Sequence, residues 1–153
     1  MINHCTAKFS IAQTRDTATT DHLASAWASF AEPLNWPRWF PGLKQVTGQH
    51  LDQPGRGSNV RLEFGGHAEV WTIVRWVPGR CLAIRRCRVG RDMVRSITLQ
   101  QTVNEEPYGL TASEFLLEGI GKLLTPWYLF SEKRTVSQIS KSLAQLIAAD
   151  QRE

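Results

Sequence analysis

The sequence predicts an α+β domain in which seven antiparallel strands form a sheet around one long C-terminal helix. Between residues 43 and 118, short runs of alternating apolar and polar residues are separated by turn-forming residues, which is typical of strands. From Leu123 to Ile147 the apolar residues recur at steps of three and four, which is typical of an amphipathic helix. Because the sheet and the helix each have one apolar face to bury, the simplest arrangement packs these faces together.

The first part of the chain predicts a strand and two short helical segments. Residues 5–13 alternate apolar and polar side chains and form the first strand. Thr19 or Thr20 caps a helix that ends near Glu32, because the following proline disfavours a helical residue before it. Residues 33–42 are too rich in proline for a long helix and predict a single helical turn.

Six further strands and the terminal helix follow. The short connections between the strands imply antiparallel pairing. The terminal helix is expected to begin at a Thr125 cap, to hold Pro126 in its first turn and to end at Asp150. The predicted strands are residues 43–49, 60–64, 67–77, 80–89, 93–103 and 110–118.

Composition agrees with a single domain over residues 1–153, with its core at about 5–150. Of the 153 residues, 42% are hydrophobic and 21% are charged, which excludes a disordered tail, a fibrous repeat and a disulfide-stapled mini-protein. The net charge of +4 is only mildly basic, so nucleic acid is not the favoured partner. We expect no transmembrane segment, because no apolar run approaches the ~20 residues that span a bilayer.

The cysteines point to a reducing compartment. Cys5, Cys81 and Cys87 form no CxxC pair, and an odd number of cysteines without metal-ligand spacing is typical of such a compartment. The N-terminus has no basic start followed by an apolar stretch, so no signal peptide is expected. The expected location is the cytoplasm.

Several short motifs occur in a characteristic order. They are Trp36-Pro37-x-Trp39-x-Pro41-Gly42, Gly57 before a strand, Pro78-Gly79-Arg80 between two strands, and Glu118-Gly119 before the terminal helix. With the element order, they resemble the polyketide cyclase/dehydrase branch of the START-like (SRPBCC, birch-pollen-allergen-like) superfamily. The resemblance implies a helix-grip fold, in which a curved seven-stranded sheet and the terminal helix enclose an apolar cavity. It also implies binding of lipids, polyketides or sterols and, in some members, aromatase/cyclase activity, but it supplies no catalytic motif.

Aromatic side chains are the main candidates for the cavity wall. Six tryptophans is a high count for this length, and large rigid rings suit flat apolar ligands. The candidates between residues 36 and 40 either plug one end of the sheet or form a pocket lip, and those on the terminal helix are expected to line an opening. The aromatic and apolar candidates are Trp36, Trp39, Phe40, Phe64, Ile97, Phe115, Trp127 and Phe130.

Polar candidates come from strand 67–77, although the inward face of this strand is undecided. Only one of its two sets can face inward. If the set with the two charged residues does, these need buried partners. From this set we retain Glu69, Trp71 and Arg75 as pocket candidates. The sets are Glu69, Trp71, Ile73 and Arg75 on one face, and Val70, Val74 and Trp76 on the other.

Five arginines fall within eleven residues: Arg85, Arg86, Arg88, Arg91 and Arg95. They form either a solvated hairpin surface or a site for an anion, such as a ligand carboxylate or an RNA phosphate. Arg95 shares strand parity with apolar residues that look inward, which favours recognition of a ligand carbonyl or carboxylate, unless its head group reaches solvent. Glu114 on the next strand is a candidate partner for Arg95.

No motif for metal or cofactor chemistry is present. The four histidines occur singly, and the sequence has no GxSxG motif, phosphate loop or dinucleotide fingerprint. We therefore expect no metal and no cofactor, and assign no catalytic residue, although His67, Glu69 and Arg75 suit proton transfer.

The favoured function is binding of a hydrophobic lipid- or polyketide-like molecule between sheet and helix. The first alternative is a polyketide cyclase/dehydratase-type enzyme acting on such a ligand. The second is an interaction protein that uses the basic hairpin at residues 85–95. Trp127, Tyr128 and Phe130 spread around the terminal helix, so we expect one of them to be exposed and to suit a homodimer.

Overall fold

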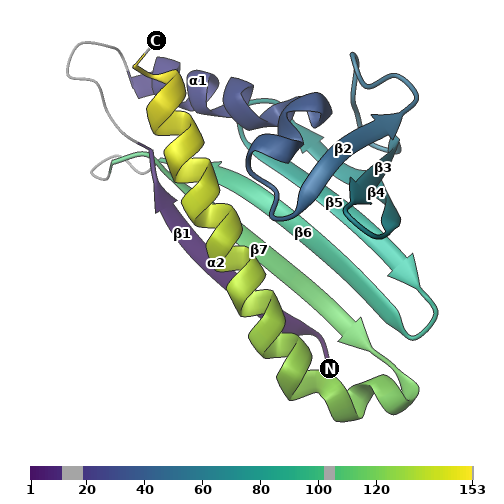
Figure 1. Ribbon diagram of the computed structural model, residues 1–153. Helices are drawn as coiled ribbons and strands as arrows, with labels where there is room; N and C mark the ends of the chain where they lie inside the picture. The colour runs from purple at the N-terminus through teal and green to yellow at the C-terminus, as the bar shows by residue number, and fades with distance from the viewer. Residues whose placement is uncertain (12–18, 102–105, 153) are drawn as a thin grey trace.

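The computed structural model describes residues 1–11, 19–101 and 106–152 (Figure 1). The predicted order of one strand, two short helices, six strands and a long helix is confirmed. The predicted strand ends at residues 13 and 103 lie outside the described residues. The elements are β1 (Asn3–Ser10), α1 (Thr19–Ala31), the 3-10 helix η1 (Pro33–Arg38), β2 (Leu43–Gly48), β3 (Asn59–Phe64), β4 (Ala68–Val77), β5 (Cys81–Arg88), β6 (Arg91–Gln100), β7 (Tyr108–Leu117), the 3-10 helix η2 (Gly119–Leu124) and α2 (Thr125–Asp150).

The seven strands form one antiparallel sheet in the order β1-β7-β6-β5-β4-β3-β2. Strands β2 to β7 pair with their neighbours in the chain, whereas β1 closes the far edge beside β7, with Asn3 opposite Phe115. The sheet is curved, and α2 runs along its hollow side (Figure 1). This arrangement is the predicted α+β helix-grip fold.

Helix α2 packs mainly on β1 and β7 at one side of the sheet. Pro126 lies in its first turn, as predicted, where proline removes no helical hydrogen bond. Thr125 does not cap the helix with its side chain, because its hydroxyl donates instead to the Lys122 carbonyl at 2.7 Å. The buried face of α2 consists of Glu132, Val136, Ile139, Ser140, Leu143, Leu146 and Ile147.

The segment after α1 supplies aromatic rings to the core beside β2 and β3. Trp36, Trp39 and Phe40 are all buried. The ring of Trp39 meets that of Phe30 edge-on at 6.5 Å between centroids, and Phe40 packs on Phe64 at 5.9 Å. Such contacts favour a closed aromatic layer. The segment therefore closes the part of the sheet that lies away from α2.

A β-bulge divides β4 into two parts with opposite orientation. Ile73 pairs with Ile84 and Arg75 with Ala83, so β4 contains one extra residue at this point. Before the bulge, Trp71 and Ile73 are fully buried; after it, Arg75 is exposed. The set containing Glu69 therefore faces inward only as far as Ile73. The prediction that Arg75 lines the interior is wrong, because the bulge reverses the parity of the strand.

Candidate functional site

A small cavity lies between the sheet and α2. Its volume is about 20 Å³, which holds about one water molecule. Phe40 and Trp39 line it from the η1 side, Ile97 from the sheet and Val136 from α2. Among these apolar walls the single charged lining residue is Arg95.

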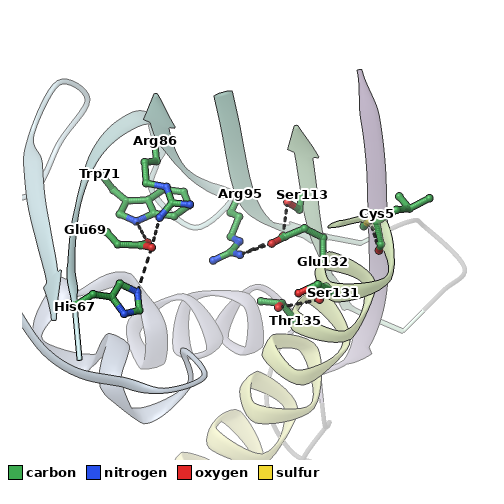
Figure 2. Close-up of polar contacts among 11 residues, drawn as sticks. Cys5, His67, Glu69, Trp71, Arg86, Arg95, Ser113, Ser131, Glu132 and Thr135 are labelled. Atoms are coloured by element: carbon green, nitrogen blue, oxygen red, sulfur yellow. Dashed lines mark hydrogen bonds and ion pairs between the residues drawn. The ribbon is translucent and has the colours of Figure 1, made fainter. Parts of the chain in front are cut away.

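Arg95 joins β6 to α2 across the interior. One guanidinium nitrogen, Nη2, lies 2.8 Å and 3.1 Å from the two carboxylate oxygens of Glu132 (Figure 2). The guanidinium also lies over the rings of Trp71 and Phe40, 5.3 Å and 5.4 Å from their centroids. The side chains of Arg95 and Glu132 are 14% and 8% exposed, so the attraction is little screened by water. These contacts hold Arg95 in one position at the cavity wall.

The contacts of Arg95 and Glu132 leave one hydrogen-bond donor of Arg95 without a partner among the described residues. Ser113 Oγ on β7 donates to Glu132 Oε2 at 3.0 Å, which further fixes the carboxylate. Arg95 Nε is buried and has no hydrogen-bond partner among the described residues. A buried donor without a partner is costly, so an acceptor that reached Arg95 Nε would form a favourable hydrogen bond.

A second buried ion pair, Glu69 and Arg86, lies on the neighbouring strands β4 and β5. The side chains are 12% and 6% exposed. Trp71 Nε1 donates to Glu69 Oε2 at 2.9 Å, and the Arg86 guanidinium lies 5.1 Å from the Trp71 ring centroid. Both buried arginines, Arg86 and Arg95, therefore contact the same indole ring.

The second ion pair keeps its carboxylate charged. Burial by itself would raise the pKa of Glu69, but the hydrogen bond from Trp71 and the charge of Arg86 hold that pKa below its usual value of 4.5. Burial lowers the pKa of Arg86, against the opposing effect of Glu69. Because guanidinium groups stay protonated in proteins, the interior presents fixed charges of both signs at neutral pH.

His67 lies at the exposed end of this cluster (Figure 2). Its Nε2 is 3.4 Å from Glu69 Oε1, and its ring stacks on Phe64 with centroids 4.9 Å apart. The side chain is 61% exposed. A carboxylate neighbour orients an imidazole ring, and imidazole is a common general acid or base. His67 is therefore the candidate group for proton transfer.

Apart from Arg75, the sequence-predicted site residues fall into four groups. Trp39, Phe40, Arg95 and Ile97 line the cavity, and Glu69 and Trp71 form the polar cluster beside it. Trp36 and Phe115 are buried in the core, and Phe64 packs between Phe40 and His67. Trp127 and Phe130 are 64% and 69% exposed, so they do not line the cavity. The helical period places both on the face of α2 opposite its buried stripe.

Sequence reasoning missed two residues of the site, Glu132 and Arg86. Glu132 stands in a polar run, but it precedes Val136 by four residues and therefore shares the buried face of α2. Arg86 lies two residues after the buried Ile84 on β5, so strand alternation could have predicted that its side chain faces inward.

Glu114 is not the partner of Arg95. It is exposed and lies 3.4 Å from His4 Nδ1 on the outer face of the sheet. The inward residues of β7 are instead Thr111, Ser113 and Phe115. Glu114 alternates with these residues and therefore faces outward.

The five arginines at residues 85–95 are divided between the interior and the surface. Arg86 and Arg95 face inward, whereas Arg85 forms an exposed ion pair with Asp92 that lowers the pKa of this carboxyl group. Arg91 lies 5.2 Å from the ring centroid of Tyr128, and Arg88 is exposed. The hairpin thus does not present all five charges on one face. Within residues 1–11, 19–101 and 106–152, no cluster of His, Cys, Asp and Glu suited to a metal occurs.

Comparison with known proteins connects this geometry to a family. Residues 21–125 match the family described as polyketide cyclase/dehydrase and lipid transport. No curated protein matches the chain in sequence.

Solved structures share the fold at low identity. The Zhui aromatase/cyclase from a Streptomyces species is 17% identical with a TM-score of 0.65, covering 99% of this chain and 95% of its own. A norcoclaurine synthase mutant from Thalictrum flavum is 10% identical with a TM-score of 0.67, covering 99% and 96%. The di-domain aromatase/cyclase StfQ of the steffimycin pathway is 12% identical with a TM-score of 0.70, covering 99% and 52%.

These findings agree with the helix-grip fold and the START-like superfamily expected from the motifs. The family match extends over more than half of the chain and includes β2 to β7, which carry Glu69, Arg86 and Arg95. The chain belongs to the polyketide cyclase/dehydrase and lipid transport family.

Proposed function

We propose that the protein binds a hydrophobic, polyketide- or lipid-like small molecule between the sheet and α2, and that Arg95 recognises an oxygen atom of this ligand. The observation that carries the proposal is Arg95 as the single charged residue of a mostly apolar cavity wall, with its Nε unpartnered among the described residues. A ligand carbonyl or carboxylate satisfies such a donor, and the apolar wall accepts the remainder of the molecule.

Binding requires the cavity to expand. Its volume of about 20 Å³ is far below the roughly 300–1,000 Å³ of pockets that hold drug-sized ligands. Trp39 and Phe40 follow the short helix η1, and Trp39 Nε1 has no hydrogen-bond partner within the described part of the chain. No hydrogen bond from its indole to the described residues therefore holds Trp39, and the Phe40 ring is held by packing and by the Arg95 guanidinium 5.4 Å from its centroid. We propose that both rings move aside when a ligand enters.

Titration with emodin, a flat tricyclic compound with ketone and hydroxyl oxygens, tests this proposal. Trp39 and Trp71 lie at the site, so saturable quenching of tryptophan fluorescence is expected. Arg95→Met combined with Glu132→Gln removes the guanidinium without leaving a buried charge. This double variant is expected to bind emodin about tenfold or more weakly, because a hydrogen bond to a charged group is lost.

Arg85→Met is the matched control, since Arg85 lies on the same hairpin but forms its ion pair at the surface. It is expected to bind emodin like the wild type. Native mass spectrometry of the purified protein, searching for a co-purified apolar ligand, provides an independent readout. Equal affinities of the wild type and the double variant for emodin would contradict the proposal that Arg95 recognises the ligand.

A second candidate function is polyketide cyclase/dehydratase-type catalysis, and the His67–Glu69 pair is the observation that favours it. In such a reaction His67 removes a proton from a carbon next to a ketone, and the resulting enolate carbon forms a bond to a second carbonyl carbon. Arg95 stabilises the oxyanion that develops there, and protonated His67 returns its proton to this oxygen. His67 then removes the second proton from the carbon that formed the bond, the C–O bond breaks, and the hydroxyl takes up that proton and leaves as water. The aromatase/cyclase neighbours support this chemistry only at the level of fold.

The cyclase proposal is tested with a linear poly-β-ketone thioester, following the dehydrated aromatic product by mass spectrometry. His67→Gln is expected to reduce turnover about 100-fold or more, the usual contribution of a general base. His4→Gln is the control, because His4 also lies 3.4 Å from a glutamate but on the outer face of the sheet. Turnover that is absent in the wild type excludes the catalytic proposal while leaving the binding proposal intact.

A further inference from the structure

Exposed apolar side chains gather at one end of the molecule. The described residues include eleven exposed large apolar side chains, and six of these belong to the β5–β6 turn, η2 and the first turns of α2. Their exposed fractions run from 51% for Leu124 to 108% for Val89. We call this set the apolar end. It consists of Val89, Ile120, Leu123, Leu124, Trp127 and Phe130.

The three segments of the apolar end are in contact. The Glu118 amide donates to the Gly90 carbonyl at 2.9 Å, which joins η2 to the tip of the β5–β6 hairpin. Val89, Leu124 and Tyr128 line one shallow surface groove. In Figure 1 the start of α2 and η2 project beyond the sheet. These contacts place the hairpin tip, η2 and the start of α2 side by side, and a large exposed apolar patch usually marks a docking surface.

Basic side chains accompany the apolar end. Within residues 88–91 and 118–134, Glu118 is the only exposed acidic residue, because Glu132 is buried against Arg95. Trp127 and Tyr128 add amphipathic rings, which meet edge-on at 5.2 Å. Aromatic and aliphatic side chains beside basic ones are typical of surfaces that lie in the interface of a lipid bilayer. The basic residues are Arg88, Arg91, Lys122, Lys133 and Arg134.

We propose that the apolar end docks on the surface of an anionic lipid bilayer. The apolar side chains enter the headgroup region, and the five basic side chains meet lipid phosphates. A second copy of the chain suits this patch less well, since a two-fold contact brings together two patches that carry the same excess of basic residues. No helix among the described residues is long and apolar enough to span a membrane. This inference goes beyond ligand binding and does not depend on it.

Vesicle flotation tests the proposal. The full chain is mixed with vesicles of phosphatidylcholine alone or of phosphatidylcholine and phosphatidylglycerol. Strong flotation is expected only with the anionic vesicles, and it should weaken as salt is added. Of the six tryptophans, all within the described residues, only Trp127 is exposed. Its fluorescence emission is therefore expected to shift to the blue on binding. Trp127→Phe should abolish most of this shift while retaining flotation.

Two pairs of substitutions locate the contact. Leu123→Ser/Phe130→Ser removes apolar contact and Lys122→Gln/Arg134→Gln removes charge; each is expected to lower partitioning onto anionic vesicles about tenfold or more. Leu34→Ser/Val70→Ser is the matched control, because these side chains are 62% and 56% exposed on other elements, η1 and β4. It should float like the wild type.

Three results overturn the proposal. One is the absence of binding to anionic vesicles. Another is equal flotation of Leu123→Ser/Phe130→Ser and the wild type. The third is a dimer, detected by sedimentation, that does not bind vesicles and that Leu123→Ser/Phe130→Ser abolishes. In that case a second copy of the chain covers the apolar end. All variants lie at exposed positions, so circular dichroism is expected to confirm unchanged folding.

Discussion

At the scale of single residues, the interior contains charged side chains that are paired with each other and largely shielded from water. Arg95 and Glu132 are both largely buried, and each provides the counter-charge of the other. Removing one member of a buried ion pair is costly because the remaining charge stays in an apolar environment. Replacing both members by neutral groups avoids this cost. The net stability gained from such a pair is therefore expected to be small, although its two contacts fix the position of the guanidinium.

A double-mutant cycle tests this view of Arg95 and Glu132. Glu132→Gln alone is expected to lower the free energy of unfolding by about 3 kcal/mol, because Arg95 loses its counter-charge. Arg95→Met/Glu132→Gln is expected to recover part of this loss, so the two effects are not additive. Urea unfolding measures all four proteins. Additive effects of the two single substitutions contradict a direct interaction.

Glu69 is expected to make the stability of the folded protein vary with pH in the acidic range. Because the pKa of Glu69 is lowered in the folded protein, its stabilising contribution is complete above the usual value of 4.5 and is lost as the pH falls through the lower folded value. Glu69→Gln lacks this contribution. The difference in stability between the wild type and Glu69→Gln is therefore expected to shrink as the pH falls below about 4.5.

Urea unfolding between neutral pH and pH ~3 measures this difference, and the pH range follows from the linkage of protonation to folding. Asp92 is the comparison, because its pKa is also lowered, by the surface hydrogen bond from Arg85. Asp92→Asn is expected to have a smaller effect than Glu69→Gln, since solvent screens the exposed pair. A pH-independent difference for Glu69→Gln contradicts the assigned ion pair.

At the scale of elements, close packing of β1 on β7 depends on a glycine. Gly109 stands opposite Phe9, and an added Cβ atom would lie 1.9 Å from Phe9 Cζ. Gly109→Ala is therefore expected to displace the Phe9 ring and to lower stability by about 1–3 kcal/mol, the usual cost of overpacking. Thermal unfolding measures the change.

Gly65→Ala provides the control for this substitution, because no atom lies within 4 Å of a Cβ added there. Its melting temperature is expected to stay close to that of the wild type. If Gly109→Ala is equally neutral, the ring of Phe9 does not cover the glycine in solution.

The kind and order of the elements were predictable from local pattern, whereas two strand faces were not. In β4 the bulge adds one residue without a change in composition, so Arg75 and Trp76 exchange sides at a point the alternation does not mark. In β7 the inward face contains Thr111 and Ser113, which are polar because they meet α2, as in the Ser113–Glu132 hydrogen bond. Because these inward residues are polar, a prediction that places apolar residues in the core assigns the wrong face of β7 to the interior.

At the scale of the whole molecule, the fold was predictable because one apolar sheet face and one apolar helix stripe admit few arrangements. The site was predictable in part. Arg95 was recognised from its parity, but its partner Glu132 lies 37 residues away on the helix, and only the tertiary fold brings them together. The exposure of Trp127 and Phe130 likewise depends on where α2 meets the sheet.

The same tertiary arrangement separates two surfaces with different roles. The interior site lies between α2, the sheet and the aromatic segment after η1. The apolar end lies where η2 and the first turns of α2 extend beyond the sheet (Figure 1). Substitutions in one are therefore expected to leave the other unchanged. Leu123→Ser/Phe130→Ser should bind emodin like the wild type, which the fluorescence titration measures, because sites without shared contacts behave independently.

A crystal structure of the protein with emodin tests the central claim most directly. The account predicts that emodin lies between the sheet and α2, that a ligand oxygen accepts a hydrogen bond from Arg95, and that Trp39 and Phe40 have moved to enlarge the cavity of about 20 Å³. Emodin bound only on the outer surface, with the interior still filled by its own side chains, would contradict it.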